Sequence, residues 1–310
     1  MTHSTHMSTK MRRYKKFEIK PFLKEFYRNY FPTSRDNLKQ VIIKSIFIIF
    51  VVLVVISCLC FSFYYGEINK QENIINSSRE VFLKYDNETS FKILSQQNSD
   101  YVGWLKIGNT KIDYPVYKAE NNKFYLTRNG FKKTSSLGSL FMDYRSSRED
   151  KNIVIYGNAL KNGKMFGELC NFRMVEYYNR NSILQFTGPK GTCNYKIFAV
   201  FVLNAKKEDD GGHIYNIYRK NFLDDGDFEN WINEANKRSI INTKVDVITQ
   251  DNILTLVTSC DDFENARLVI MARSQREEEN LYALPMVATI NKNPIYPKKW
   301  YENKGIEYPF

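Results

Sequence analysis

The sequence contains only three histidines among its 310 residues, at positions 3, 6 and 213. Its five cysteines form no Cys-x-x-Cys pair, and no histidine lies close to them in the sequence. Zinc sites are built from such spacings, so their absence argues against zinc. No loop has the ligand spacing of a calcium site, and nothing in the sequence is typical of nucleotide or haem binding. We therefore expect no cofactor and no metal.

Glycine and proline are also sparse, at 14 and 8 residues, whereas aromatic residues make up 15% of the chain. Apolar material is therefore sufficient for a packed globular core. Half of the prolines follow Arg273, in a segment that begins with the charged run SQREEEN. This change in composition predicts a C-terminal extension outside the core, residues 274–310, with the character of a disordered tail.

Charged residues are absent from one long stretch, Ser45 to Gly66, which reads SIFIIFVVLVVISCLCFSFYYG. About 20 mostly apolar residues are enough for a helix to span a bilayer. Residues 1–44 carry a net charge of +8 out of the total of +11, and an excess of Lys and Arg marks the cytoplasmic side of a span. We predict a cytoplasmic basic tail over residues 1–44, a single-pass transmembrane anchor over residues 45–66 and an extracytoplasmic remainder. The basic charge thus indicates a membrane surface and not nucleic acid.

Two other interpretations of the apolar stretch compete with an uncleaved anchor. A buried core helix is disfavoured because the run is uninterrupted and the charge on its flanks is so asymmetric. A cleaved signal peptide is disfavoured because the basic region is too long and no small-x-small site follows the run.

The periodicity of apolar residues changes after the anchor. Residues 67–100 carry apolar residues at helical spacing, such as Ile74 and Val81, and predict a helical lead-in. From Val102 onward the sequence reads as many short strands with few helices, which favours a β-rich barrel or sandwich. We predict a mainly β domain with flanking helices over residues 101–273.

Five segments of this region together resemble the class B sortases, membrane-anchored cysteine transpeptidases of Gram-positive bacteria. They are VGWLKIGNTKIDYPVY (102–117), SLGSLFMDYRSS (136–147), NIVIYGNALKNGKMFGEL (152–169), KIFAVFV (196–202) and ILTLVTSCDDFENARLVIMAR (253–273). The resemblance covers about residues 75–273 and implies a sortase-like eight-stranded β-barrel preceded by an N-terminal helix. It also implies an activity, the cleavage of C-terminal sorting signals and attachment of proteins to the cell wall. The implied partners are a sorting-signal-bearing surface protein or peptide and a cell-wall peptidoglycan precursor.

The chemistry of this family uses a cysteine nucleophile, a histidine that moves protons and an arginine that steadies the oxyanion or the substrate. The family's histidine follows Tyr-Gly, and the segment YGNALKNG places Asn158 at that position. The family's cysteine closes a Thr-Leu-x-Thr-Cys segment, and TLVTS places Ser259 there, with Cys260 one residue late. Asparagine does not exchange a proton usefully near pH 7, and a serine without an adjacent base is a weak nucleophile.

The residues that follow determine which neighbour occupies the nucleophile position. The family pattern has a Phe four residues after the cysteine and Ala-Arg at seven and eight. Counted from Ser259, these positions hold Phe263, Ala266 and Arg267. Counted from Cys260, each of these residues comes one position too early to match the family pattern. Because successive side chains of a strand point to opposite faces, Cys260 should face away from Ser259 unless a bulge intervenes.

Each of these residues also has a structural interpretation. Cys260 is more often a small buried residue than a nucleophile. Arg267 has three acidic neighbours with which it can pair, Asp261, Asp262 and Glu264. His213 lies in KKEDDGGHIY, which reads as a surface loop. Cys170 and Cys193 can form a disulfide if the compartment permits one.

We hypothesise a degenerate sortase, which keeps the fold in an accessory or binding role and has lost transpeptidase chemistry through Asn158 and Ser259. The alternative is an active, divergent cysteine transpeptidase or endopeptidase that uses Cys260, with a bulge and another proton carrier such as His213. A serine hydrolase built on Ser259 is a weaker hypothesis, because no base is evident. A designed inactive variant is disfavoured, because Ala159 also departs from the family pattern.

Overall fold

The computed structural model describes residues 19–207, 214–280 and 287–309. The chain divides into two compact units, Met1–Gly66 and Glu67–Phe310. In the N-terminal unit, helix α1 (Ile19–Tyr30) precedes the first part of helix α2 (Leu38–Lys84). Within α2 an 18-residue window has a mean hydropathy of 3.2 and no buried residue, so this helix is long and apolar enough to cross a membrane.

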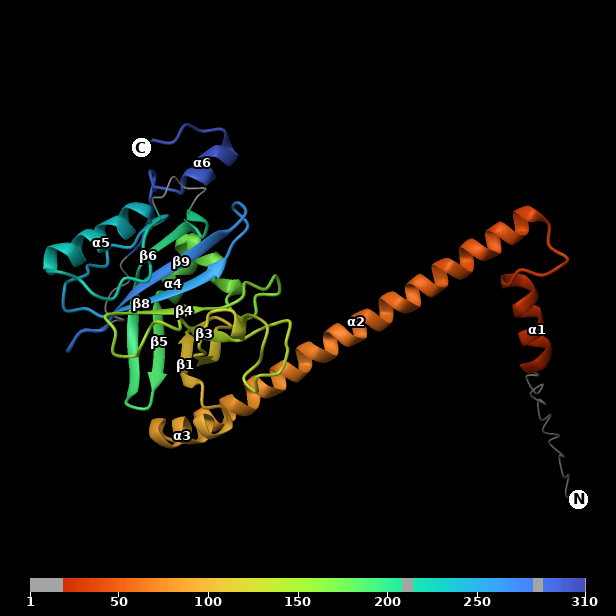
Figure 1. The fold of residues 1–310 in the computed structure, drawn as a ribbon, viewed down its shortest axis with the longest axis horizontal. Helices are drawn as coiled ribbons and strands as arrows, with labels where there is room; N and C mark the ends of the chain where they lie inside the picture. Colours follow the sequence, from red (N-terminus) through yellow and green to blue (C-terminus); the bar gives the residue numbers. More distant parts are fainter. Residues whose placement is uncertain (1–18, 208–213, 281–286, 310) are drawn as a thin grey trace, which may run out of the picture. The chain divides into compact units, whose positions relative to one another are not determined.

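The second unit is built around a closed β-barrel of eight strands in the order β1-β2-β3-β4-β8-β9-β6-β5 (Figure 1). The strands are β1 (Tyr101–Ile107), β2 (Asp113–Tyr117), β3 (Leu140–Met142), β4 (Asn152–Tyr156), β5 (Ile183–Gly188), β6 (Gly191–Asn204), β8 (Ile253–Ser259) and β9 (Ala266–Ser274). Strands β2 and β3 are parallel, as are β4 and β8, and the other neighbours are antiparallel. Closure leaves no free sheet edge, and the predicted eight-stranded barrel is confirmed.

The first six residues of strand β8 are buried because both of its faces are covered. Leu254 and Leu256 belong to the core cluster that gathers side chains from all eight strands. Ile253 and Val257 belong to a second cluster, in which they pack with residues of helix α5 (Asp225–Arg238) such as Trp231. The alternation is the two-residue period of a strand, so helix α5 covers the outer face of this part of the barrel (Figure 1).

Short helices complete the second unit. Helix α3 (Asn87–Gln97) begins at the capping residue Asp86, whose carboxylate accepts a hydrogen bond from the backbone N–H of Thr89. The remaining elements are the 3₁₀ helices η1 (Phe124–Leu126) and η2 (Gly167–Arg173), helices α4 (Val175–Asn181) and α6 (Lys298–Lys304), and a two-stranded sheet of β7 (Ile241–Asn242) and β10 (Thr289–Ile290).

The C-terminal segment differs from the sequence prediction. Residues 287–309 are not an extension outside the core, because β10 pairs with β7 and Ala288 is buried in the barrel cluster. The rings of Tyr296 and Trp300 stack with centroids 4.0 Å apart and pack against the same cluster. Prolines and charged residues are frequent in this segment, but a few well-placed aromatic side chains are enough to dock it.

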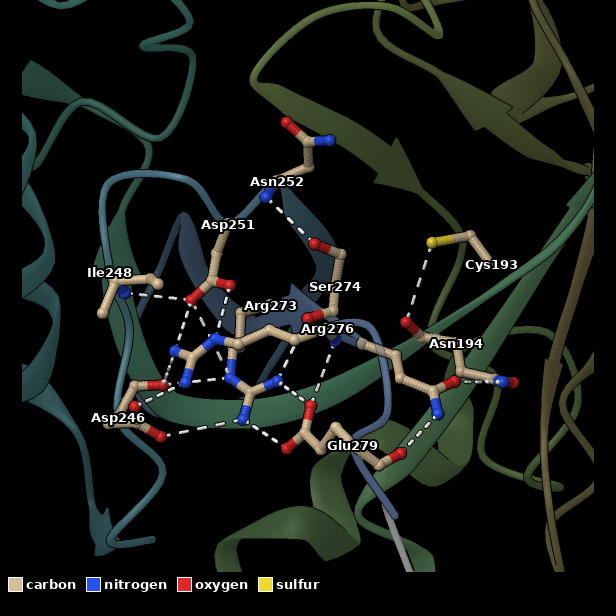
Figure 2. Close-up of polar contacts among 11 residues, drawn as sticks. Cys193, Asn194, Asp246, Ile248, Asp251, Asn252, Arg273, Ser274, Arg276 and Glu279 are labelled. Carbon is tan, nitrogen blue, oxygen red and sulfur yellow. Dashed lines mark hydrogen bonds and ion pairs between the residues drawn. The ribbon is translucent and has the colours of Figure 1, made fainter.

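An ionic network also ties the segment after Arg273 to the barrel, as Figure 2 shows. Arg273 is 2% exposed and donates from Nη1 and Nη2 to the two carboxylate oxygens of Glu279, each at 2.6 Å. Arg276 donates to both oxygens of Asp251 at 2.9 and 2.8 Å and to Asp246 at 2.7 Å. The predicted domain boundary after residue 273 therefore falls inside a connected set of ion pairs.

Candidate functional site

Three neighbouring strand ends bring Asn158, Ser259 and Arg267 together. Strands β4 and β8 run in parallel with Tyr156 beside Val257, so Asn158 leaves β4 next to the end of β8. The hydroxyl of Thr258 donates to the carbonyl of Gly157 at 2.7 Å and fixes this alignment. Ser259 and Arg267 are partners across β8 and β9, and partners in an antiparallel pair place their side chains on the same face.

Ser259 is the last residue of β8 and the first exposed one, after six buried residues. Its position in the alternation matches that of Val257, which packs on the outer face of the barrel beneath α5. Ser259 and Arg267 are therefore outward-facing neighbours at one end of the barrel.

The side chain of Asn158 is committed to two backbone carbonyls. Its Nδ2 donates to the oxygen of Leu126 at 2.9 Å and to that of Leu137 at 3.0 Å. Both amide protons are thus used to hold the loop between these two residues against the end of β4. A carboxamide in this position has no proton to exchange near neutral pH.

Arg267 is half-buried and free of acidic partners in the part of the chain that the structure describes. Its Nη1 donates to the carbonyl of the adjacent Ala266 at 2.9 Å. The pairing with Asp261, Asp262 or Glu264 that the sequence left open is not formed among the described residues, and Asp262 pairs with Arg173 instead. A guanidinium group carries five N–H donors, so Arg267 retains donors for a ligand beside Ser259.

Cys260 directly follows β8, and strand alternation directs its side chain to the face opposite that of Ser259. The β8–β9 ladder is regular up to the Ser259–Arg267 pair, so no bulge turns Cys260 towards Arg267. The side chain is half-buried and packs against the barrel cluster, as its place in the alternation requires. Burial and the nearby carboxylate of Asp262 raise the pKa of the Cys260 thiol to about 12. At neutral pH this thiol is uncharged and a poor nucleophile.

A cleft of about 410 Å³ opens beside Ser259 and Cys260. Its walls come from the loop that follows β4, from η2 and from the first residues after β8, and they include Leu160, Glu168 and Cys170. Neither Asn158 nor Arg267 lines it. The cleft therefore includes Ser259 together with Cys260 and does not extend to Asn158 or Arg267.

Sequence reasoning missed the ion pair between Arg173 and Asp262. Arg173 of η2 donates from Nη1 and Nη2 to the two oxygens of Asp262, at 3.0 and 2.6 Å. Burial opposes ionisation of Asp262, but the hydrogen bonds from Arg173 outweigh it and lower the pKa of that carboxyl. No local motif signals this pair, because its members are distant in the sequence and meet only when η2 packs near the end of β8.

The other candidates stand as follows. Cys170 in η2 and Cys193 in β6 are free thiols in the structure. His213, which the alternative hypothesis offers as a possible proton carrier, lies outside the described residues, as do His3 and His6. The described residues contain no group of three or more His, Cys, Asp or Glu side chains that could hold a metal ion.

A closed eight-stranded barrel with these strand ends is the architecture of a sortase. The family model described as the sortase domain matches residues 105–275, and the chain belongs to this family. Its relatives are class B sortases. Sortase B of Listeria monocytogenes is 33% identical over 187 residues, which cover 58% of this chain and 72% of the relative. Sortase B of Staphylococcus aureus is 28% identical over 187 residues, covering 59% and 73%.

The fold comparison agrees with the sequence comparison. The crystal structure of sortase B from Clostridium perfringens matches with a TM-score of 0.55 at 32% identity, over 60% of this chain and 99% of that one. The predicted resemblance to class B sortases is therefore confirmed.

Proposed function

We propose that this chain is a membrane-anchored class B sortase-type protein that binds a sorting-signal peptide without cutting it. One observation carries the proposal. The position beside Arg267 is occupied by the exposed hydroxyl of Ser259, while the neighbouring Asn158 amide is tied to two carbonyls. Hydrogen-bond donors for a peptide remain, but among the described residues neither a thiolate nor a proton carrier stands next to them.

The arrangement in the membrane forms part of the same proposal. The apolar helix α2 anchors the chain, residues 1–44 lie in the cytoplasm, and the barrel lies on the outside, where sorting signals are presented. The positive charge of residues 1–44 supports this direction. A peptidoglycan precursor remains a predicted second partner, and its use would require the transpeptidase chemistry that we propose is lost.

The alternative, an active enzyme that uses Cys260, receives less support. It needs a thiol that faces Arg267 and ionises near neutral pH. Cys260 packs towards the barrel cluster, and its pKa is raised to about 12 by burial and Asp262. Detection of a peptide covalently bound to this thiol would favour the active-enzyme alternative.

Replacing Arg267 with alanine is expected to weaken peptide binding by about 10- to 100-fold, because a hydrogen bond to a charged group contributes about 1.5–3 kcal/mol. The measurement is fluorescence anisotropy of the full chain in detergent, with labelled sorting-signal peptides from surface proteins encoded in the same genome. Lys190→Ala is the matched control. It removes the same charge from the turn between β5 and β6, at the far end of β6 from Asn204, which pairs with Ala266. Equal affinities of the Arg267→Ala and Lys190→Ala variants would contradict the proposed binding face.

A further inference from the structure

A second cleft, of about 460 Å³, shares no lining residue with the cleft beside Ser259. Its walls come from the segment that follows β2, from Tyr144 after β3, and from Asp100 and Lys132. Strand β3 is antiparallel to β4, so Tyr144 lies towards the beginning of β4, whereas Asn158 follows the end of that strand. We call this hollow the Tyr144 cleft. Its volume falls within the range of about 300–1,000 Å³ that is usual for small-molecule sites.

The ring of Tyr144 is exposed and yet held in place. The side chain is 47% exposed, and the backbone N–H of Tyr144 donates to Oδ1 of Asn122 at 3.0 Å. The guanidinium carbon of Arg145 lies 5.2 Å from the ring centroid. Arg145 is fixed in turn, because its Nε and Nη2 donate to the two oxygens of Asp143, each at 2.8 Å, and Asp143 is 1% exposed. A ring that is ordered in advance loses little conformational freedom when a ligand binds.

The charges that line the Tyr144 cleft balance one another. Lys132 pairs with Asp100 at 3.0 Å. Lys118 donates from Nζ to the carbonyl of Ser146 at 2.6 Å, and Glu120 is exposed and forms no ion pair with a described residue. Two cations and two carboxylates favour neither an anionic nor a cationic ligand. The polar groups that remain are hydrogen-bond donors and acceptors for an uncharged one.

We propose that the Tyr144 cleft binds a neutral oligosaccharide. A pyranose ring has a flat face of C–H groups and a rim of hydroxyl groups. The C–H face packs on the Tyr144 ring, with the half-buried Phe124 as a second apolar surface. The hydroxyl groups bond to Glu120 and Asn121, which line the cleft between the two rings in the sequence. A cell-wall glycan has this chemistry, and the outward placement of the barrel proposed above brings it within reach.

A proline-rich peptide is the main rival ligand, because such peptides also dock on exposed aromatic rings. Grooves for proline-rich peptides are apolar, whereas Lys118, Glu120 and Asn121 line this cleft together with its aromatic rings. A peptide that adds as an extra strand is disfavoured, because the closed barrel offers no free edge. Charge balance and polar lining therefore favour the sugar.

The test is saturation-transfer difference NMR on the full chain in a detergent without a sugar headgroup, with tetra-N-acetylchitotetraose as the probe. We expect saturation of the pyranose C–H protons and a dissociation constant that Tyr144→Ala raises at least about tenfold. Tyr144→Phe keeps the ring and should change that constant less than about twofold. Tyr85→Ala is the matched control and should leave binding unchanged, because Tyr85 is 40% exposed and does not line the cleft.

Absence of saturation transfer to the sugar at millimolar concentrations would overturn the proposal, as would equal losses in the Tyr144→Ala and Tyr85→Ala variants. Binding of decaproline or hexaglutamate in place of the sugar would also overturn it, since the first marks a peptide groove and the second an anion site. Sorting-signal peptides should bind Tyr144→Ala as they bind the parent. Loss of sugar binding alone thus counts against this inference, and loss of peptide binding alone counts against the proposed function.

Discussion

The variant Asn158→His/Ser259→Cys is expected to cleave sorting-signal peptides at a rate at least about 100-fold above that of the parent chain. The reason is geometric. The two positions lie at adjacent ends of the parallel strands β4 and β8, and Ser259 already faces the same side as Arg267. The two substitutions supply a nucleophile and a proton carrier to a site that retains the arginine.

The size of the effect follows from how such groups act together. Positioned acid–base catalysis contributes about 10²- to 10⁴-fold, and removal of one member of a catalytic triad costs about 10⁴- to 10⁶-fold in other enzymes. Each single variant should therefore stay close to the parent, because a lone cysteine or a lone histidine lacks its partner. The new histidine must also replace at least one of the two hydrogen bonds that Asn158 donates to Leu126 and Leu137.

Peptide cleavage is measured by chromatography of the reaction products after hours of incubation with the full chain in detergent. The Ser259→Cys and Asn158→His single variants are the controls. If the double variant remains as inert as the singles while its unfolding midpoint matches the parent, then the lost residues are not what separates this chain from an active sortase.

Replacing Arg273 with methionine is expected to destabilise the barrel by about 3–5 kcal/mol, the usual cost of removing one partner from a buried charge network. Arg273 is 2% exposed and makes hydrogen bonds to Glu279 and to the backbone oxygens of Asp246 and Ser274 (Figure 2). Glu279 would lose both of its guanidinium donors, whereas Asp251 would keep Arg276.

The measurement is urea unfolding followed by tryptophan fluorescence. Lys237→Met is the matched control, because it removes a cation from a pair with Glu234 whose side chains are 60% and 42% exposed. Exposed pairs contribute about 0–1 kcal/mol, so this variant should unfold almost where the parent does. A similar, small effect of both substitutions would mean that the network does not hold the segment after residue 273 to the barrel.

The sequence predicted the barrel well because its strands are unusually explicit. The run ILTLVTS carries leucines on one face and Ile253 and Val257 on the other, and apolar residues on both faces are typical of a strand covered on both sides. The order and spacing of the five segments that resemble class B sortases were sufficient to predict the family. Residue counting matched Ser259 to the family's cysteine position, whereas its pairing with Arg267 across β8 and β9 became evident only in the structure.

The features that escaped prediction depend on contacts between distant parts of the chain. Arg173 and Asp262 lie on η2 and on the turn after β8, and no spacing links them. The docking of residues 287–309 escaped prediction for a similar reason. Their burial depends on where Ala288 and Tyr296 meet the barrel, whereas composition reports only how many prolines and charges the segment contains.

The central claim, that this sortase-type protein binds a sorting signal without cutting it, is tested most directly by intact-mass spectrometry of the full chain incubated with a labelled sorting-signal peptide. Binding is followed by anisotropy in the same sample. The account predicts a bound, intact peptide and a protein of unchanged mass. A cleaved peptide together with an acyl adduct on Cys260 or Ser259, abolished by alanine at that position, would contradict it.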